Sequence, residues 1–200
     1  MTNLDPLPDE LQTILEDSGL EVSVIEGLRR NLIDGALDSQ LNHVQGEVKF
    51  PLAEDISDLP QGAAERAELK LLGEAAIREG QVGLVVLNGG MATRFGGVVK
   101  GTVKVDEARS FLGLKLLDAK RTAEDAGGPL PPVLFMNSRA TNRSTRQHLE
   151  ANDYFGYDPD KVWLFEQCWS VRFETNGEVF IGEDGAPSFH GPGHGDLLSR

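Results

Sequence analysis

Cysteine is nearly absent from this chain, and long apolar runs are missing. One of its 200 residues is cysteine, Cys168, so neither an internal disulfide nor a cysteine-ligated zinc site is expected. The longest apolar run, residues 82–87, is far too short to cross a membrane. The first residues lack the basic and apolar segments of a secretory signal, so we expect a cytoplasmic protein.

Basic residues are outnumbered, and the imbalance is uneven. The net charge is −13; residues 1–60 hold 13 acidic and 3 basic residues, and residues 61–200 hold 19 and 16. So acidic a chain is a poor non-specific nucleic-acid binder, because phosphate contacts need clustered lysine and arginine. We therefore expect small-molecule partners, and neither a nucleic acid nor a membrane. A local basic excess over residues 94–121 could serve a small phosphorylated ligand.

The sequence changes character near residue 60. Residues 9–43 carry apolar residues at three- and four-residue spacings, which predict helices. Residues 44–60 contain prolines and a glycine and are typical of a connector. We expect a helical appendage with its connector over residues 1–60 and a second domain over residues 61–200.

Predicted helices and strands alternate over residues 61–166. Apolar runs at 82–87, 133–136 and 162–165 predict buried strands, and the helices are expected at 63–79, 111–126 and 141–151. This alternation is typical of βαβ units that form a parallel sheet, with right-handed crossovers placing helices on both faces. Trp163 and Phe165 are expected in the core. Shorter alternating stretches over residues 170–190, around Asn176 and Gly177, predict a hairpin.

A glycine-rich segment, LNGGMATRFGG at residues 87–97, directly follows the first predicted strand. Ligands of open α/β sheets bind beyond the carboxyl ends of strands, and glycines let backbone N–H groups converge on an anion. Thr93 adds a hydroxyl donor, Arg94 a planar fork suited to phosphate, and Lys100 a further charge. The segment is not a dinucleotide fingerprint, because Ala92 replaces the second glycine, and no Gly-Lys-Ser/Thr makes it a Walker loop.

Five motifs between residues 84 and 197 resemble those of one family, in the same order. They are the segment 87–97 with Lys100, SFL at 110–112 with Leu114, PVLFMNS at 132–138, FEQ at 165–167 and GPGHGD at 191–196. The set resembles sugar-nucleotide pyrophosphorylases, and among them the UTP–glucose-1-phosphate uridylyltransferase (UDP-glucose pyrophosphorylase) family. The resemblance implies an α/β, Rossmann-like nucleotidyltransferase fold of the glycosyltransferase-A type, with a mixed sheet flanked by helices. It also implies transfer of UMP from UTP to glucose 1-phosphate, with Mg²⁺ as cofactor.

The resemblance further implies roles for individual residues. The loop residues that would hold UTP are Leu87, Asn88, Gly89, Gly90, Thr93 and Gly96. Lys100 and Arg94 would act as the catalytic cations on the phosphates. Gln167 and the Gly195 backbone would recognise uracil, and His194 would contact the sugar phosphate or the nucleotide phosphates. The sugar phosphate would displace pyrophosphate directly, so positioning and charge neutralisation would supply the rate.

Some features depart from the family pattern. Ala92 stands where the family has glycine, and no proline precedes Lys100, which leaves Lys104 as a second candidate for the phosphate lysine. The resemblance places the metal-binding aspartate and the C-terminal part of the fold beyond Arg200, so no metal ligand is expected in this chain.

Several alternatives stay open at this point. The chain could be a truncated, non-catalytic nucleotide-binding module, or its acceptor could be galactose 1-phosphate or N-acetylglucosamine 1-phosphate. The Gly-His-Gly-Asp element favours glucose, because the N-acetylglucosamine enzymes usually lack it. Gln167 could be an ordinary strand-end residue, and His194 an ordinary loop residue. Cys168 is expected as a small buried hydrophobe and Asp196 as a helix N-cap. The oligomeric state is not indicated.

Overall fold

The computed structural model describes residues 5–37, 43–44, 46–92 and 97–199, which form two compact units. One unit, here the sheet unit, is Pro51–Glu166; the other, here the terminal unit, combines Met1–Phe50 with Gln167–Arg200. Residues from Gln167 onward, which the sequence analysis assigned to the second domain, thus group by their contacts with the N-terminal helices. None of the helices in the described ranges is long and apolar enough to span a bilayer.

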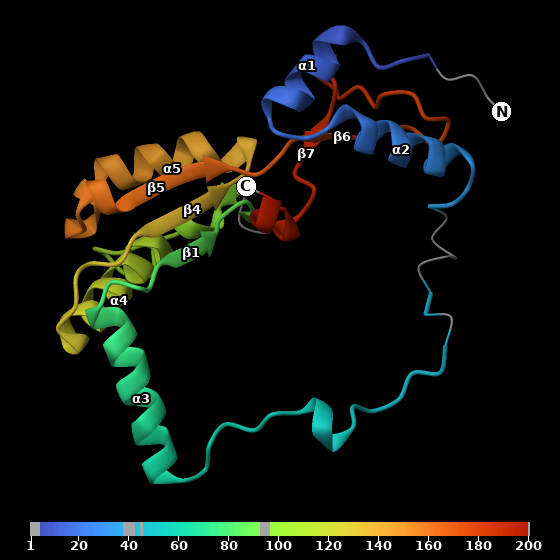
Figure 1. Ribbon diagram of the computed structural model, residues 1–200. Coiled ribbons are helices and arrows are strands. Elements are labelled where there is room, and N and C mark those ends of the chain that lie inside the picture. Colours follow the sequence, from blue (N-terminus) through green and yellow to red (C-terminus); the bar gives the residue numbers. More distant parts are fainter. Residues whose placement is uncertain (1–4, 38–42, 45, 93–96, 200) are drawn as a thin grey trace. The chain divides into compact units, whose positions relative to one another are not determined.

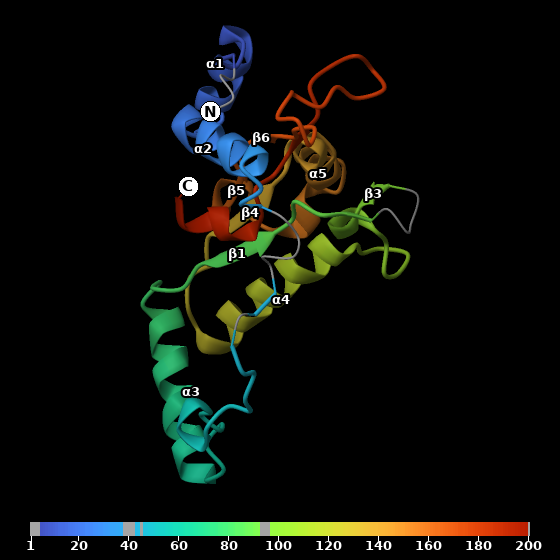
Figure 2. The ribbon, with the colours of Figure 1, turned by 90° about the vertical axis from the view of Figure 1, so that its right-hand side faces the viewer.

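A three-stranded parallel sheet organises the sheet unit. It consists of β1 (Leu84–Leu87), β4 (Val133–Asn137) and β5 (Val162–Glu166), with β4 in the middle (Figures 1 and 2). The helix α4 (Phe111–Ala126) connects β1 to β4, and α5 (Arg139–Ala151) connects β4 to β5. The predicted βαβ units and parallel sheet are confirmed.

Both crossover helices pack on the same face of this sheet. Leu112 and Leu116 of α4 and Leu149 of α5 form one buried cluster with Val86 and Phe135 of the strands. The strand order follows the chain order, and right-handed crossovers that step in one direction return to the same face. The prediction of helices on both faces is therefore wrong for the described residues, since that would require the strand order to reverse.

The opposite face of the sheet is largely uncovered. Val85, Leu87 and Trp163 lie on it and are between 40% and 48% exposed. The expectations of a first strand buried on both faces and of Trp163 in the core are therefore wrong: β1 and β5 are the edge strands, and each lacks a neighbour on one side. The central strand β4 is the buried one, with Val133, Phe135, Met136 and Asn137 all inaccessible.

The helix starts are fixed by side chains that the sequence makes recognisable. The Ser110 hydroxyl caps α4 by accepting a hydrogen bond from the backbone N–H of Gly113 at 3.2 Å. Ser138 and Thr141 form a reciprocal capping box at the start of α5, so this helix begins two residues before the predicted position. The third helix, α3 (Ala63–Arg78), buries no residue and is tied to the end of α4 by a hydrogen bond from Arg78 Nε to the Ala126 carbonyl.

A left-handed turn follows α5. The short helix η5 (Asp153–Gly156) contains three consecutive non-glycine residues, 153–155, with φ between 47° and 54°. Such a conformation costs about 1–2 kcal/mol per residue, so neighbouring contacts must hold it. The Phe155 ring packs against Gly113 and lies 5.6 Å from the ring of His148. After the turn, the Tyr157 hydroxyl donates to the Pro131 carbonyl at 2.7 Å.

The terminal unit packs two helices on a hairpin. The helices are α1 (Asp9–Asp17) and α2 (Val22–Ile33); the hairpin closes where β6 (Ser170–Val171) pairs with β7 (Phe189–His190). Its inner end turns at Gly177, whose carbonyl accepts a hydrogen bond of 2.6 Å from Arg29 Nε of α2. The shared core contains Leu7, Leu11, Leu15, Ile25 and Val171. The predicted helices and hairpin are confirmed; that they share a core was not foreseen.

The one-sided sheet predicts unequal costs for two aromatic substitutions. Phe135→Ala removes a fully buried ring and should lower the free energy of unfolding by about 3–5 kcal/mol. Trp163→Ala removes a ring that is 48% exposed and should cost less than half of that. Urea unfolding followed by circular dichroism measures both. Equal losses would show that the second face is covered.

A second prediction concerns pH. His148 Nε2 lies 2.8 Å from Ser110 Oγ, which already accepts the Gly113 N–H, so Ser110 donates its hydrogen to an unprotonated ring nitrogen. Burial, and secondarily the charge of Lys104, lower the pKa of His148. The unfolded chain therefore binds a proton that the folded chain does not, and the free energy of unfolding should fall as the pH drops below about 6.5.

The matched variants for this prediction are His148→Gln and His190→Gln, the latter on an exposed histidine. Urea unfolding at pH 7.5 and pH 5 should show a smaller pH dependence for His148→Gln than for the unmodified chain, and an unchanged one for His190→Gln. A His148→Gln chain with the full pH dependence would contradict the assignment.

Candidate functional site

Polar residues gather where the three parallel strands end. Asn88 directly follows β1, Asn137 is the last residue of β4, and Glu166 is the last residue of β5. The backbone N–H of Asn88 donates to the Met136 carbonyl at 2.8 Å, which extends the β1–β4 pairing to the start of the glycine-rich segment. This is the edge of an open α/β sheet at which ligands bind.

A chain of buried hydrogen bonds connects these strand ends. Asn88 Nδ2 donates to Asn137 Oδ1 and to Thr145 Oγ1, both at 2.8 Å. Asn137 Nδ2 donates to Asn142 Oδ1 at 3.0 Å, and Asn142 Nδ2 to Glu166 Oε1 at 2.5 Å. Because Asn88 and Asn137 are buried, leaving either amide unpaired would cost about 1–3 kcal/mol. This network fixes the point at which the glycine-rich segment leaves β1.

The Asn88 side chain therefore serves the fold. Both of its amide hydrogens are used inside the protein, so its backbone is the part left to contact a nucleotide. The sequence analysis did not single out Asn137, Asn142 or Glu166. The signal that could have found them is a polar residue at the end of each apolar strand.

The glycine-rich segment folds back on itself as a small hairpin. β2 (Met91–Ala92) pairs antiparallel with β3 (Val98–Val99), with Met91 opposite Val99. The same register places Lys100 opposite Gly90, and Lys100 Nζ lies 3.9 Å from the position that a Cβ on Gly90 would occupy. The structure thus brings together two residues that the resemblance assigns to the phosphates, with the lysine exposed at the strand-end edge.

Close packing after Lys100 holds this lysine in place. Gly101, within the short helix η4 (Lys100–Thr102), is buried, and a Cβ there would lie 2.5 Å from Asn88 Oδ1 and 2.7 Å from Leu112. Only glycine fits, so the backbone beside Lys100 rests directly on Asn88. The hydrogen-bond network of the strand ends therefore also positions the lysine.

Two points left open by the sequence are answered here. Ala92 lies in a strand, and the positive-φ non-glycine residues of the described ranges are all at 153–155, so its methyl group causes no backbone strain. Lys100, and not Lys104, is the lysine beside Gly90; the charge of Lys104 acts on His148. Thr93, Arg94 and Gly96 lie outside the described residues, and their roles stay predictions.

The residues expected to read the base lie in the terminal unit. Gln167 directly follows β5 and is 6% exposed, and its Oε1 atom has no hydrogen-bond partner among the residues that the structure describes. Its amide packs on Gly191, where a Cβ would overlap Nε2 and Cδ. Two of the five motifs, FEQ and GPGHGD, therefore meet. An unpaired buried oxygen is costly, so a donor from a ligand would stabilise this site.

The remaining residues of the last motif lie at the start of the short helix η7 (His194–Ser199). His194 and Gly195 are both exposed, and the space around Gly195 is open for 4 Å beyond its Cα substituent position. Asp196 is the third residue of this helix rather than the residue before it, so its prediction as an N-cap is wrong. Cys168 is buried, as expected.

The described residues contain no group of three or more histidine, cysteine, aspartate or glutamate side chains that could hold a metal ion. They do not fit the Mg²⁺ that the resemblance implies. No step of the chemistry proposed below is assigned to a metal.

Comparison with known proteins agrees with the motifs. UDP-N-acetylglucosamine diphosphorylase 1 of Arabidopsis thaliana is 29% identical over 180 residues, covering 80% of this chain and 34% of that protein. The UDP-N-acetylglucosamine pyrophosphorylase of Saccharomyces cerevisiae is 26% identical over 165 residues, covering 72% and 34%. The chain thus spans about a third of the length of these relatives.

The fold is also that of a solved relative. The uridine diphosphate N-acetylglucosamine pyrophosphorylase of Trypanosoma brucei, in complex with an inhibitor, superposes with a TM-score of 0.73 at 22% identity, over 94% of this chain and 38% of that one. The profile of the family described as UTP–glucose-1-phosphate uridylyltransferase matches residues 39–200, which include all five motifs. The chain belongs to the UTP–glucose-1-phosphate uridylyltransferase family.

Proposed function

We propose that this chain supplies the nucleotide-binding part of an enzyme that transfers UMP from UTP to a hexose 1-phosphate, releasing pyrophosphate. The observation that carries the proposal is the placement of Lys100 beside Gly90 at the carboxyl edge of the parallel sheet. Family membership supports it, and so does the buried, unpaired Oε1 of Gln167.

The proposed chemistry is a direct displacement. An oxygen of the sugar phosphate attacks the α-phosphorus of UTP, the bond from that phosphorus to the bridging oxygen breaks, and pyrophosphate leaves with the electron pair. Backbone N–H groups of Gly89 and Gly90 would hold the phosphates, and Lys100 would offset the negative charge on the leaving group. Thr93, Arg94 and Gly96 would complete the phosphate contacts.

Base recognition is proposed for the terminal unit. The Gln167 amide offers an acceptor beside a donor, the complement of the N3–H and O4 groups of uracil. The Gly195 backbone would add a contact to the base, and the exposed His194 would reach a phosphate of the sugar or the nucleotide. We propose Mg²⁺ as the cofactor on the family resemblance alone, without assigning its ligands.

Two acceptor sugars are supported by different observations. The relatives from Arabidopsis thaliana, Saccharomyces cerevisiae and Trypanosoma brucei are named for UDP-N-acetylglucosamine, which favours N-acetylglucosamine 1-phosphate. The Gly-His-Gly-Asp element at residues 193–196 favours glucose 1-phosphate. Galactose 1-phosphate has no observation of its own in its favour.

A second candidate function is nucleotide binding without transfer. It is favoured by the absence of a metal-ligand cluster from the described ranges, and by a length about a third of that of the relatives. An assay with UTP and each of the three hexose 1-phosphates separates the candidates. Formation of a UDP-sugar supports the transferase and names the sugar; UTP binding with no product supports the binding module.

The nucleotide assignment predicts the behaviour of Lys100→Ala. In calorimetric titrations the unmodified chain should bind UTP more tightly than ATP, and Lys100→Ala should bind UTP about tenfold more weakly, because one charge-assisted phosphate contact is lost. Lys70→Ala removes an exposed lysine of α3 that pairs with Glu74, and it serves as the control. Equal UTP affinity in the Lys100→Ala and Lys70→Ala chains would contradict the role of Lys100.

A further inference from the structure

We infer that Gly191 is a specificity-determining residue, which positions the Gln167 amide and so sets the preference for uracil over cytosine. The inference rests on the proposed function, since it assigns a role to a neighbour of the residue proposed to read the base. Gly191 has no role in the resemblance described above, which takes Gln167, His194 and Gly195 as the contact residues.

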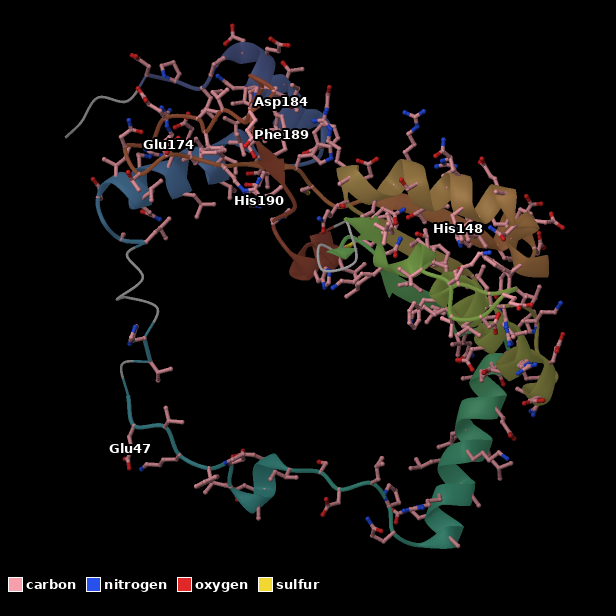
Figure 3. The ribbon with its side chains drawn as sticks, turned by 180° about the vertical axis from the view of Figure 1, so that it is seen from behind. Glu47, His148, Glu174, Asp184, Phe189 and His190 are labelled. Carbon is pink, nitrogen blue, oxygen red and sulfur yellow. The ribbon has the colours of Figure 1, made fainter. Side chains whose placement is uncertain are left out.

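Gly191 is held in place by the hairpin of the terminal unit. His190, directly before it, lies opposite Ser170, and Phe189 lies opposite Val171; Figure 3 labels His190 and Phe189 on this strand. The His190 Nδ1 atom also lies 2.9 Å from the Gly191 carbonyl oxygen. The strand pairing therefore fixes the backbone at Gly191.

The backbone near Gln167 is fixed as well. Trp169, two residues on, donates its backbone N–H to Ser18 Oγ of the α1–α2 connection at 2.9 Å. Cys168 between them is buried. With both backbones anchored, the Gln167 side chain lies between them, packed on the Cα of Gly191.

The glycine at 191 is required by this side chain and not by its own backbone. Its φ angle lies outside the left-handed region, so other residues could adopt the conformation. A Cβ, however, would overlap the amide nitrogen and Cδ of Gln167. Since neither backbone is free to move, the Gln167 amide would have to move instead.

Displacing that amide has a chemical consequence. Uracil presents a donor, N3–H, beside the acceptor O4, whereas cytosine presents an acceptor at N3 beside an amino donor. An amide confined to one place pairs with one of these edges and leaves the other with unpaired polar groups, which is how a polar site rejects a close analogue. A displaced amide loses both the uracil contact and the discrimination.

The test is Gly191→Ala, titrated with UTP and with CTP. We expect UTP affinity to fall about tenfold and the UTP-to-CTP affinity ratio to approach 1. In a chain that already carries Gln167→Ala, Gly191→Ala should have almost no further effect on UTP affinity, because the side chain it displaces is gone. Gly27→Ala in α2, where a Cβ meets nothing within 4 Å, is the matched control.

A second arm needs no nucleotide. The side-chain amide NMR signals of Gln167, assigned by their loss in Gln167→Met, should shift in Gly191→Ala and stay in place in Gly27→Ala. Unshifted signals, or losses of UTP affinity that add in the double variant, would overturn the inference. Absence of UTP binding by the unmodified chain would overturn the proposed function, and the amide signals would still decide whether Gly191 positions Gln167.

Discussion

The buried hydrogen bond between Asn88 and Asn137 joins two strand ends that would otherwise separate. β1 is an edge strand of four residues with one face exposed, so hydrophobic burial alone holds it weakly. The Asn88 amide adds bonds to Asn137 and Thr145, and its oxygen packs on Gly101, next to Lys100. The position of the proposed phosphate site therefore follows from a polar network rather than from the apolar core.

The same network reaches the proposed base site through the chain itself. Asn142 bonds Glu166, the last residue of the sheet unit, and Gln167 is the next residue. One peptide bond thus connects the residues that fix Lys100 with the amide proposed to read uracil. A family that builds both contacts from consecutive strand ends needs no separate recognition domain, and its reaction needs no protein nucleophile.

Local sequence signals predicted much of this molecule, and long-range contacts account for what they missed. Capping residues and apolar periodicity located α4, α5 and the three parallel strands, and the motif order identified the family. Periodicity shows that a strand is apolar, but not which sheet position it takes, so the exposure of Trp163 was not predictable. Asn88 and Asn137 are 49 residues apart, and nothing local marks Gly191 as the neighbour of Gln167.

The account's central claim is that the strand-end edge at Gly90 and Lys100 holds the phosphates of UTP. Backbone amide NMR signals recorded during titration with UTP, and separately with uridine, test it most directly. We predict that UTP shifts the signals of Gly89, Gly90 and Lys100, and that uridine leaves these three in place. UTP-induced shifts confined to another basic surface, such as the exposed Lys115 and Arg121 of α4, would contradict the claim.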